Sequence, residues 1–80
     1  MEESLDDCLK KVLRKALADS GSGSFPSAIH VSPNLHPKLV DFQHGDLVRS
    51  ADSVLFYADS SLPADECRAT WDNKEMKFLL

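Results

Sequence analysis

The first nineteen residues constrain the fold more than any other stretch, because their apolar side chains recur three and four positions apart. This spacing gathers them on one side of an α-helix. The apolar stripe consists of Leu5, Cys8, Leu9, Val12, Leu13, Ala16 and Leu17. Lysine and arginine occupy the opposite side, while acidic residues crowd the first turns and complement the helix dipole. The pattern predicts an amphipathic helix over residues 1–19.

Local signals mark both ends of this helix. Ser4 with Asp7 three positions later resembles a capping box, and Gly21 supplies a stop. Asp6 and Asp7 each precede a lysine by four positions, which is a favourable spacing for ion pairs. Four basic side chains against five acidic ones, with no aromatic anchor, favour a solvated polar side over a membrane-surface helix.

The middle of the chain predicts a linker followed by short strands. Residues 20–27 are rich in glycine and serine, which is typical of a flexible linker. Apolar and polar residues alternate over 28–32 and again over 38–42, so we expect a strand in each. Residues 43–46 are typical of a turn.

Residues 46–58 satisfy two patterns. Asp46 could cap a helix over this segment, but aromatic and β-branched enrichment favours strands at 47–49 and 54–57 joined across 50–53. Residues 60–66 are expected to form a loop. Alternation over 67–71 and 76–80 predicts a second hairpin.

Eighty residues suffice for one small domain. We predict a single α+β domain over 1–80, in which helix 1–19 packs on a small, mainly antiparallel sheet within residues 28–80, after the linker 20–27. The alternative is an all-α arrangement of three to four short helices, because residues 46–58 and 63–80 also fit helices.

The sequence shows no catalytic, cofactor or metal-binding pattern. Five and seven residues separate His30, His36 and His44 along the chain, whereas structural zinc sites place ligands in close pairs. A small metal-binding or Cys–His enzyme is the alternative, and it requires Cys67 to meet one of these histidines. We therefore expect no enzymatic activity, no cofactor and no metal.

Charge and cysteine content restrict the partners and the compartment. The net charge of −4 opposes nucleic-acid binding, and no apolar run is long enough for integral membrane association. Glu2 and Glu3 stand where a signal peptide carries basic residues, and two cysteines fit a reducing compartment. These features predict a cytoplasmic or nuclear protein.

The remaining function class is a non-enzymatic interaction module, a small subunit or adaptor that binds a protein partner or a second copy. The expected contact residues are Leu5, Leu9, Leu13, Leu17, Phe78 and Leu80, from the helix stripe and an apolar C-terminal edge. The stripe can pack on the chain's own sheet or bind another molecule. A peripheral membrane-surface protein that binds through the helix is an alternative.

Overall fold

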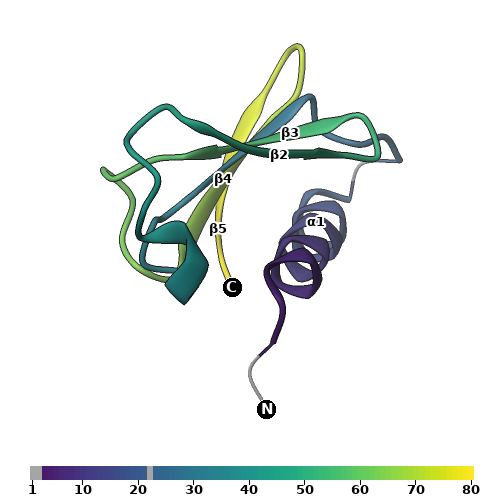
Figure 1. The fold of residues 1–80 in the computed structure, drawn as a ribbon. Helices are drawn as coiled ribbons and strands as arrows, with labels where there is room; N and C mark the ends of the chain where they lie inside the picture. Colours follow the sequence, from purple (N-terminus) through teal and green to yellow (C-terminus); the bar gives the residue numbers. More distant parts are fainter. Residues whose placement is uncertain (1–2, 22) are drawn as a thin grey trace.

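The computed structural model describes residues 3–21 and 23–80 and contains one α-helix beside a five-stranded sheet (Figure 1). The elements are α1 (Leu5–Ser20), β1 (Ala28–Val31), the 3₁₀ helix η1 (Pro37–Leu39), β2 (Leu47–Ala51), β3 (Val54–Ala58), β4 (Glu66–Thr70) and β5 (Glu75–Leu79). The α+β prediction is confirmed, and the all-α alternative is wrong.

The predicted cap at Ser4 and stop at Gly21 are confirmed, but they bound a helix over Leu5–Ser20 and not over the predicted 1–19. The backbone N–H of Asp7 donates to Ser4 Oγ at 3.1 Å, and Gly21 ends the helix in the left-handed region with its N–H donating to the carbonyl of Leu17. Two salt bridges at the start of α1 differ from the predicted i+4 pairs. Lys11 pairs with Glu3 at 2.6 Å, and Asp6 pairs with Arg49 of β2.

The sheet has the strand order β2-β3-β1-β4-β5, so β2 and β5 are its edges. The β1–β3 pair is parallel, and the three other pairs are antiparallel. Between β1 and the parallel strand β3, the chain passes through η1 and then through β2, which pairs with β3 as the edge strand of the sheet (Figure 1). The sheet is therefore mainly antiparallel, as predicted, with one parallel pair at its centre.

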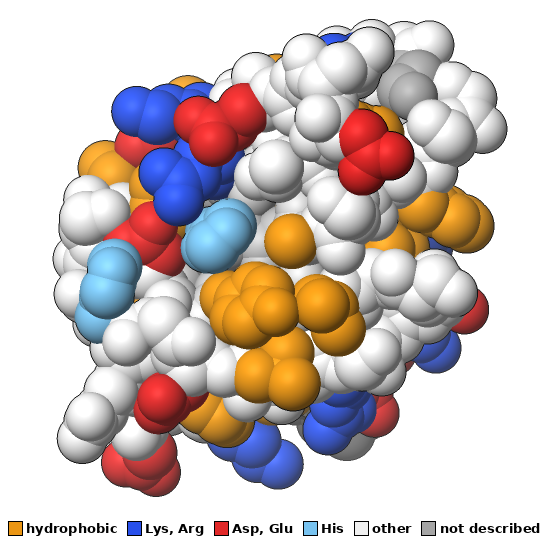
Figure 2. Space-filling view, turned by 90° about the horizontal axis from the view of Figure 1, so that it is seen from above, with side chains coloured by type: hydrophobic (Ala, Val, Ile, Leu, Met, Phe, Trp, Pro, Cys, Tyr) orange, Lys and Arg blue, Asp and Glu red, His pale blue; other side chains and the backbone are white. Residues whose placement is uncertain are grey.

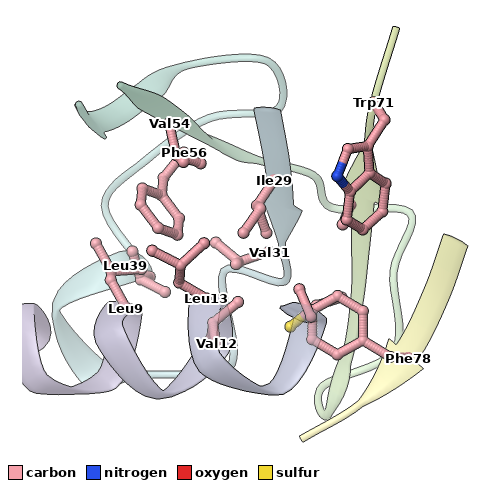
Figure 3. Close-up of a cluster of buried hydrophobic side chains, with 13 residues drawn as sticks. Leu9, Val12, Leu13, Ile29, Val31, Leu39, Val54, Phe56, Trp71 and Phe78 are labelled. Atoms are coloured by element: carbon pink, nitrogen blue, oxygen red, sulfur yellow. The ribbon is translucent and has the colours of Figure 1, made fainter. Parts of the chain in front are cut away.

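The core lies between α1 and the side of the sheet that faces it. Val12 and Leu13 of α1 lie under Ile29 and Val31 of β1, and Leu9 lies under Phe56 of β3 (Figure 3). The other large members of this core are Leu39, Val54, Trp71 and Phe78. Because strand side chains alternate between faces, only one face of the sheet contributes to this core.

The segment over 46–58 forms the predicted hairpin and not a helix. Asp52 and Ser53 connect β2 to β3 with φ angles of 52° and 66°, a two-residue turn with both residues in the left-handed region. Left-handed backbone suits the twist of a hairpin but is costly for residues other than glycine. The connection is shorter than the predicted 50–53 loop, because Ser50 and Ala51 belong to β2.

The predicted strand at 38–42 is wrong, because the backbone there forms local hydrogen bonds in a 3₁₀ helix and the turn after it, instead of bonds to a neighbouring strand. His36 Nδ1 accepts the backbone N–H of Lys38 at 3.1 Å, and Pro37 begins the 3₁₀ helix. The next two turns continue this local bonding, with Leu39 N–H donating to His36 O and Phe42 N–H to Leu39 O. Leu39 is buried and Val40 is exposed. Neighbouring residues of a half-buried strand show the same alternation of burial, which explains the mistaken prediction.

The second half of the predicted linker is tied to the sheet. Trp71 Nε1 donates to the carbonyl of Ser24 at 3.1 Å, and the backbone N–H of Ser27 donates to the carbonyl of Thr70 at 2.8 Å. Pro26 between them is buried. Residue 22 of the linker lies outside the described residues.

Candidate functional site

The face of the sheet that points away from α1 has no covering element in residues 3–21 and 23–80 (Figure 1). The strand register arranges its side chains in two rows across the five strands. In sheet order, the first row is Leu47, Tyr57, His30, Arg68 and Lys77. The second row is Ser50, Leu55, Ala28, Thr70 and Glu75. We call these ten residues the open face.

Apolar side chains gather near the middle of the open face, with histidine and charged side chains beside them (Figure 2). Leu55 and Tyr57 of β3 and Ala28 of β1 are half-buried, and Leu47 of β2 is 51% exposed. We call these four residues the apolar patch. Contiguous apolar surface of this kind, rimmed by polar groups, is a common feature of protein contact sites.

His30 links the apolar patch to the charged part of the open face. Its ring stacks beside that of Tyr57, with centroids 5.5 Å apart and planes 25° from parallel. Burial, followed by the neighbouring charge of Arg68, lowers the pKa of His30 below its ordinary value. The ring is therefore neutral at neutral pH and extends the apolar patch with an aromatic surface.

Asp59, directly after β3, anchors a polar network at one end of the open face. Its carboxylate accepts from Arg68 at 3.2 Å and from the backbone and hydroxyl of Ser61 at 2.9 and 2.5 Å. His44 Nδ1 lies 3.3 Å from the same carboxylate. Burial opposes ionisation of Asp59, but the Ser61 hydrogen bonds and the charge of Arg68 outweigh it and lower the pKa of Asp59. The network therefore fixes the position of Arg68.

Positive charge is not in excess on this side of the sheet. Arg68 and Lys77 stand against Glu66, Glu75 and the ionised Asp59. A surface that binds a polyanion through phosphate contacts needs an excess of positive charge. The open face is therefore suited to an uncharged or mixed-charge partner.

Most of the contact residues predicted from the helix stripe and the C-terminal edge are buried or half-buried in the chain's own core. Leu9 and Leu13 are 2% and 7% exposed against the chain's own sheet, and Leu5 and Leu17 are half-buried. Phe78 is buried in the same core. Of the six predicted residues, Leu80 retains the most accessible surface, at 44%.

The histidines and cysteines are dispersed. His30 lies on the open face, whereas Cys67 points into the core on the opposite side of the sheet. Burial raises the pKa of the Cys67 thiol to about 12 and also raises the pKa of Cys8, so both are protonated at neutral pH. No three potential metal ligands cluster in the described part of the chain.

His36 has a structural role at the rim of an open hollow lined by α1 and the chain's last residue. Its Nδ1 accepts the Lys38 N–H, so its Nε2 carries the ring proton and donates to the carbonyl of Glu3 at 2.7 Å. Cys8 lines the same hollow. Both ring nitrogens of His36 are engaged in tying the start of α1 to the loop before η1, so neither is free to activate a thiol.

No helix within residues 3–21 and 23–80 has the length and hydrophobicity to cross a bilayer. Comparison with protein-family models, curated proteins and solved structures finds no match for this chain.

The sequence contained a signal for the open face. Every second residue in the predicted strands points away from the core, and a single helix can cover only one side of a sheet. Strand order, which places Tyr57 between Leu47 and His30, depends on pairings between distant segments. Sequence alternation alone does not specify those pairings.

Proposed function

We propose that this protein is a non-enzymatic interaction module, a small subunit or adaptor, whose main contact surface is the open face. The observation that carries the proposal is the apolar patch on the central strands, which α1 leaves uncovered. The patch is bounded by a fixed polar network around Asp59 and Arg68. An apolar centre with a polar rim is the usual anatomy of a protein–protein interface.

The chemistry of the open face indicates the kind of partner. Tyr57 and Leu47 offer apolar contact area, and the absence of excess positive charge around them favours a protein surface with apolar side chains over nucleic acid. The packing of Leu9 and Leu13 against the sheet supports placing the main contact surface here instead of on the helix stripe. The C-terminal edge, with Leu80, is a second exposed region that supports an interaction role.

The test compares one substitution inside the patch with a matched one outside it. Leu47→Glu places a charge at the patch, whereas Val40→Glu places the same charge at an apolar residue of similar exposure, 59%, in the turn after η1. The full-length chain and both variants are used to capture proteins from cell extract, with quantitative mass spectrometry. A partner recovered in this way is then purified and its affinity measured by calorimetry.

We expect wild type and Val40→Glu to bind the same partner with equal affinity. Leu47→Glu should bind it at least about tenfold more weakly, because a contact-centre residue contributes more than about 1.4 kcal/mol to binding. Equal affinity of all three proteins would contradict the proposal, as would the absence of any partner retained by the wild type.

A further inference from the structure

The outer edge of β5 presents backbone groups that pair with no other strand in residues 3–21 and 23–80. Two hydrogen bonds fix the phase of the β4–β5 ladder: Trp71 N–H to Lys74 O at 2.8 Å, and Leu80 N–H to Asp65 O at 2.9 Å. Because bonded and non-bonded pairs alternate in an antiparallel ladder, the even-numbered residues of β5 bond to β4. The odd-numbered residues, Glu75, Lys77 and Leu79, direct their backbone N–H and C=O groups outward from the sheet.

The side chains on this edge are incompletely paired. Lys77 is exposed, lies directly opposite Arg68 and forms no salt bridge with any residue in 3–21 or 23–80. Like charges directly opposite each other on neighbouring strands are unfavourable. Glu75 lies 3.8 Å from Arg68 Nε and retains an exposed side chain. An acidic group beyond the edge would therefore relieve the unpaired charge of Lys77.

We propose that β5 pairs antiparallel with β5 of a second copy, in the register that places Glu75 opposite the partner's Lys77. The two-fold symmetry of such a pair also places Lys77 opposite the partner's Glu75. Each of these pairs exchanges two backbone hydrogen bonds, giving about four in all. Met76, half-buried on the α1 side of the sheet, meets the partner's Met76 between them.

The outward backbone groups and the charges select this register. Outward groups lie on odd-numbered residues, so odd-numbered residues must pair with odd-numbered ones. Pairing Lys77 with the partner's Lys77 sets two positive charges against each other, which is unfavourable. Pairing Lys77 with the partner's Leu79 leaves Glu75 without a counterpart. Only the Glu75–Lys77 register pairs every charge on this edge.

The other edge of the sheet is less suited to pairing. The β2–β3 ladder is irregular between Leu47 and Arg49, and the Arg49 side chain is held by Asp6 of α1. A bulge interrupts the regular spacing of outward backbone groups and blunts an edge strand. In contrast, β5 pairs with β4 in one regular register, from the pair Glu66–Leu79 to the pair Thr70–Glu75.

This inference goes beyond the proposed function, since a dimer through β5 leaves the apolar patch uncovered. The two sheets would join edge to edge with both open faces on the same side. The interface is small, so we expect a weak dimer that forms at about 0.1–1 mM protein. Such a dimer would present two patches to a partner of matching symmetry.

Analytical ultracentrifugation of the full-length chain from about 10 µM to about 1 mM tests the inference. We expect the average mass to rise from 8.9 kDa towards twice that value. Glu75→Lys and Lys77→Glu should each remain monomeric where the wild type dimerises, because each creates two like-charge pairs. The double variant Glu75→Lys/Lys77→Glu should dimerise again, and so should an equimolar mixture of the two single variants.

Lys10→Glu, on the solvent side of α1, is the control for net charge and should dimerise like the wild type. If a charge reversal prevents folding, judged by circular dichroism, Lys77→Gln serves in its place and should raise the dimer dissociation constant several-fold. A wild type that stays monomeric to 1 mM overturns the inference, as does a mixture that dimerises no better than its components. Either failure leaves the Leu47→Glu test of the open face intact.

Discussion

The packing of the helix stripe against its own sheet predicts a large cost for shortening Leu9. This side chain is 2% exposed and lies in the core between α1 and the sheet (Figure 3). Leu9→Ala removes three carbon atoms from that core. At about 0.8 kcal/mol for each buried carbon, the lost transfer free energy is about 2.4 kcal/mol.

The residual cavity adds to this loss, so the expected decrease in the free energy of unfolding is about 2–5 kcal/mol. A domain of this length has a total stability of about 4–12 kcal/mol. Leu79→Ala is the matched control, because it removes the same three carbons from a side chain that is 61% exposed. Its expected cost is below about 1 kcal/mol.

Urea denaturation followed by circular dichroism measures both variants. With a slope of about 1–2 kcal/mol/M, a loss of more than 2 kcal/mol lowers the midpoint of Leu9→Ala by about 1 M or more. A chain that is already unfolded without urea also agrees with the prediction. If Leu9→Ala and Leu79→Ala have the same midpoint, the helix stripe does not pack on the sheet and the reasoning fails.

Three further predictions concern Cys67, Asp59 and the turn between β2 and β3. Cys67 should react with a thiol reagent at neutral pH only at the rate at which the chain unfolds, because its thiol is fully buried and protonated. Urea should therefore accelerate the reaction, and fast labelling of Cys67 without urea would contradict its burial. Asp59→Asn should lower stability at pH 7. Because folding lowers the pKa of Asp59, the unfolded chain takes up the proton first, and the difference from wild type in urea titrations should shrink as the pH falls below the ordinary value of 3.8. A difference that does not change with pH would exclude the carboxylate charge as its cause. Asp52→Asn with Ser53→Gly should raise the thermal midpoint by about 4–8 °C, because asparagine and glycine tolerate the left-handed backbone of this turn at about 1 kcal/mol less cost. An unchanged or lower midpoint would show that the turn is not strained.

The sequence patterns that succeeded are local ones. The stripe from Leu5 to Leu17, the cap at Ser4 and the stop at Gly21 all follow from interactions within a few residues, and α1 has these ends. The same holds for the β4–β5 hairpin, whose strands alternate strictly and connect through a short turn. Local rules are sufficient where the contacts that satisfy them are also local.

The patterns that failed depended on competition between local structures. Leu39 and Val40 alternate as in a strand, but Pro37 and the ring of His36 offer the backbone a 3₁₀ turn in which its hydrogen bonds are already formed. Leu39 still reaches the core, from a turn instead of a strand. Burial was therefore predictable at this residue, while the backbone conformation that achieves it was not.

Which residues assemble on the open face could not be predicted from the sequence, for a different reason. Its apolar patch combines β1, β2 and β3, and two of the pairings that assemble it, Leu55 with Ala28 and Leu47 with Tyr57, join residues 27 and 10 positions apart. Alternation shows that Tyr57 and Leu55 share a face of their strand, but it does not show which face α1 covers. Only the strand order and the position of the helix resolve that choice.

The proposal that the open face is the contact surface is tested most directly by hydroxyl-radical footprinting of the wild-type chain, alone and with its captured partner. Leu47 and Tyr57 report on the apolar patch, while Val40 and Phe25, at 59% and 53% exposure, report on apolar surface elsewhere. We predict that the partner reduces labelling of Leu47 and Tyr57 and leaves labelling of Val40 and Phe25 unchanged. Protection of Val40 or Phe25 with full labelling of Leu47 and Tyr57 would contradict the proposed function.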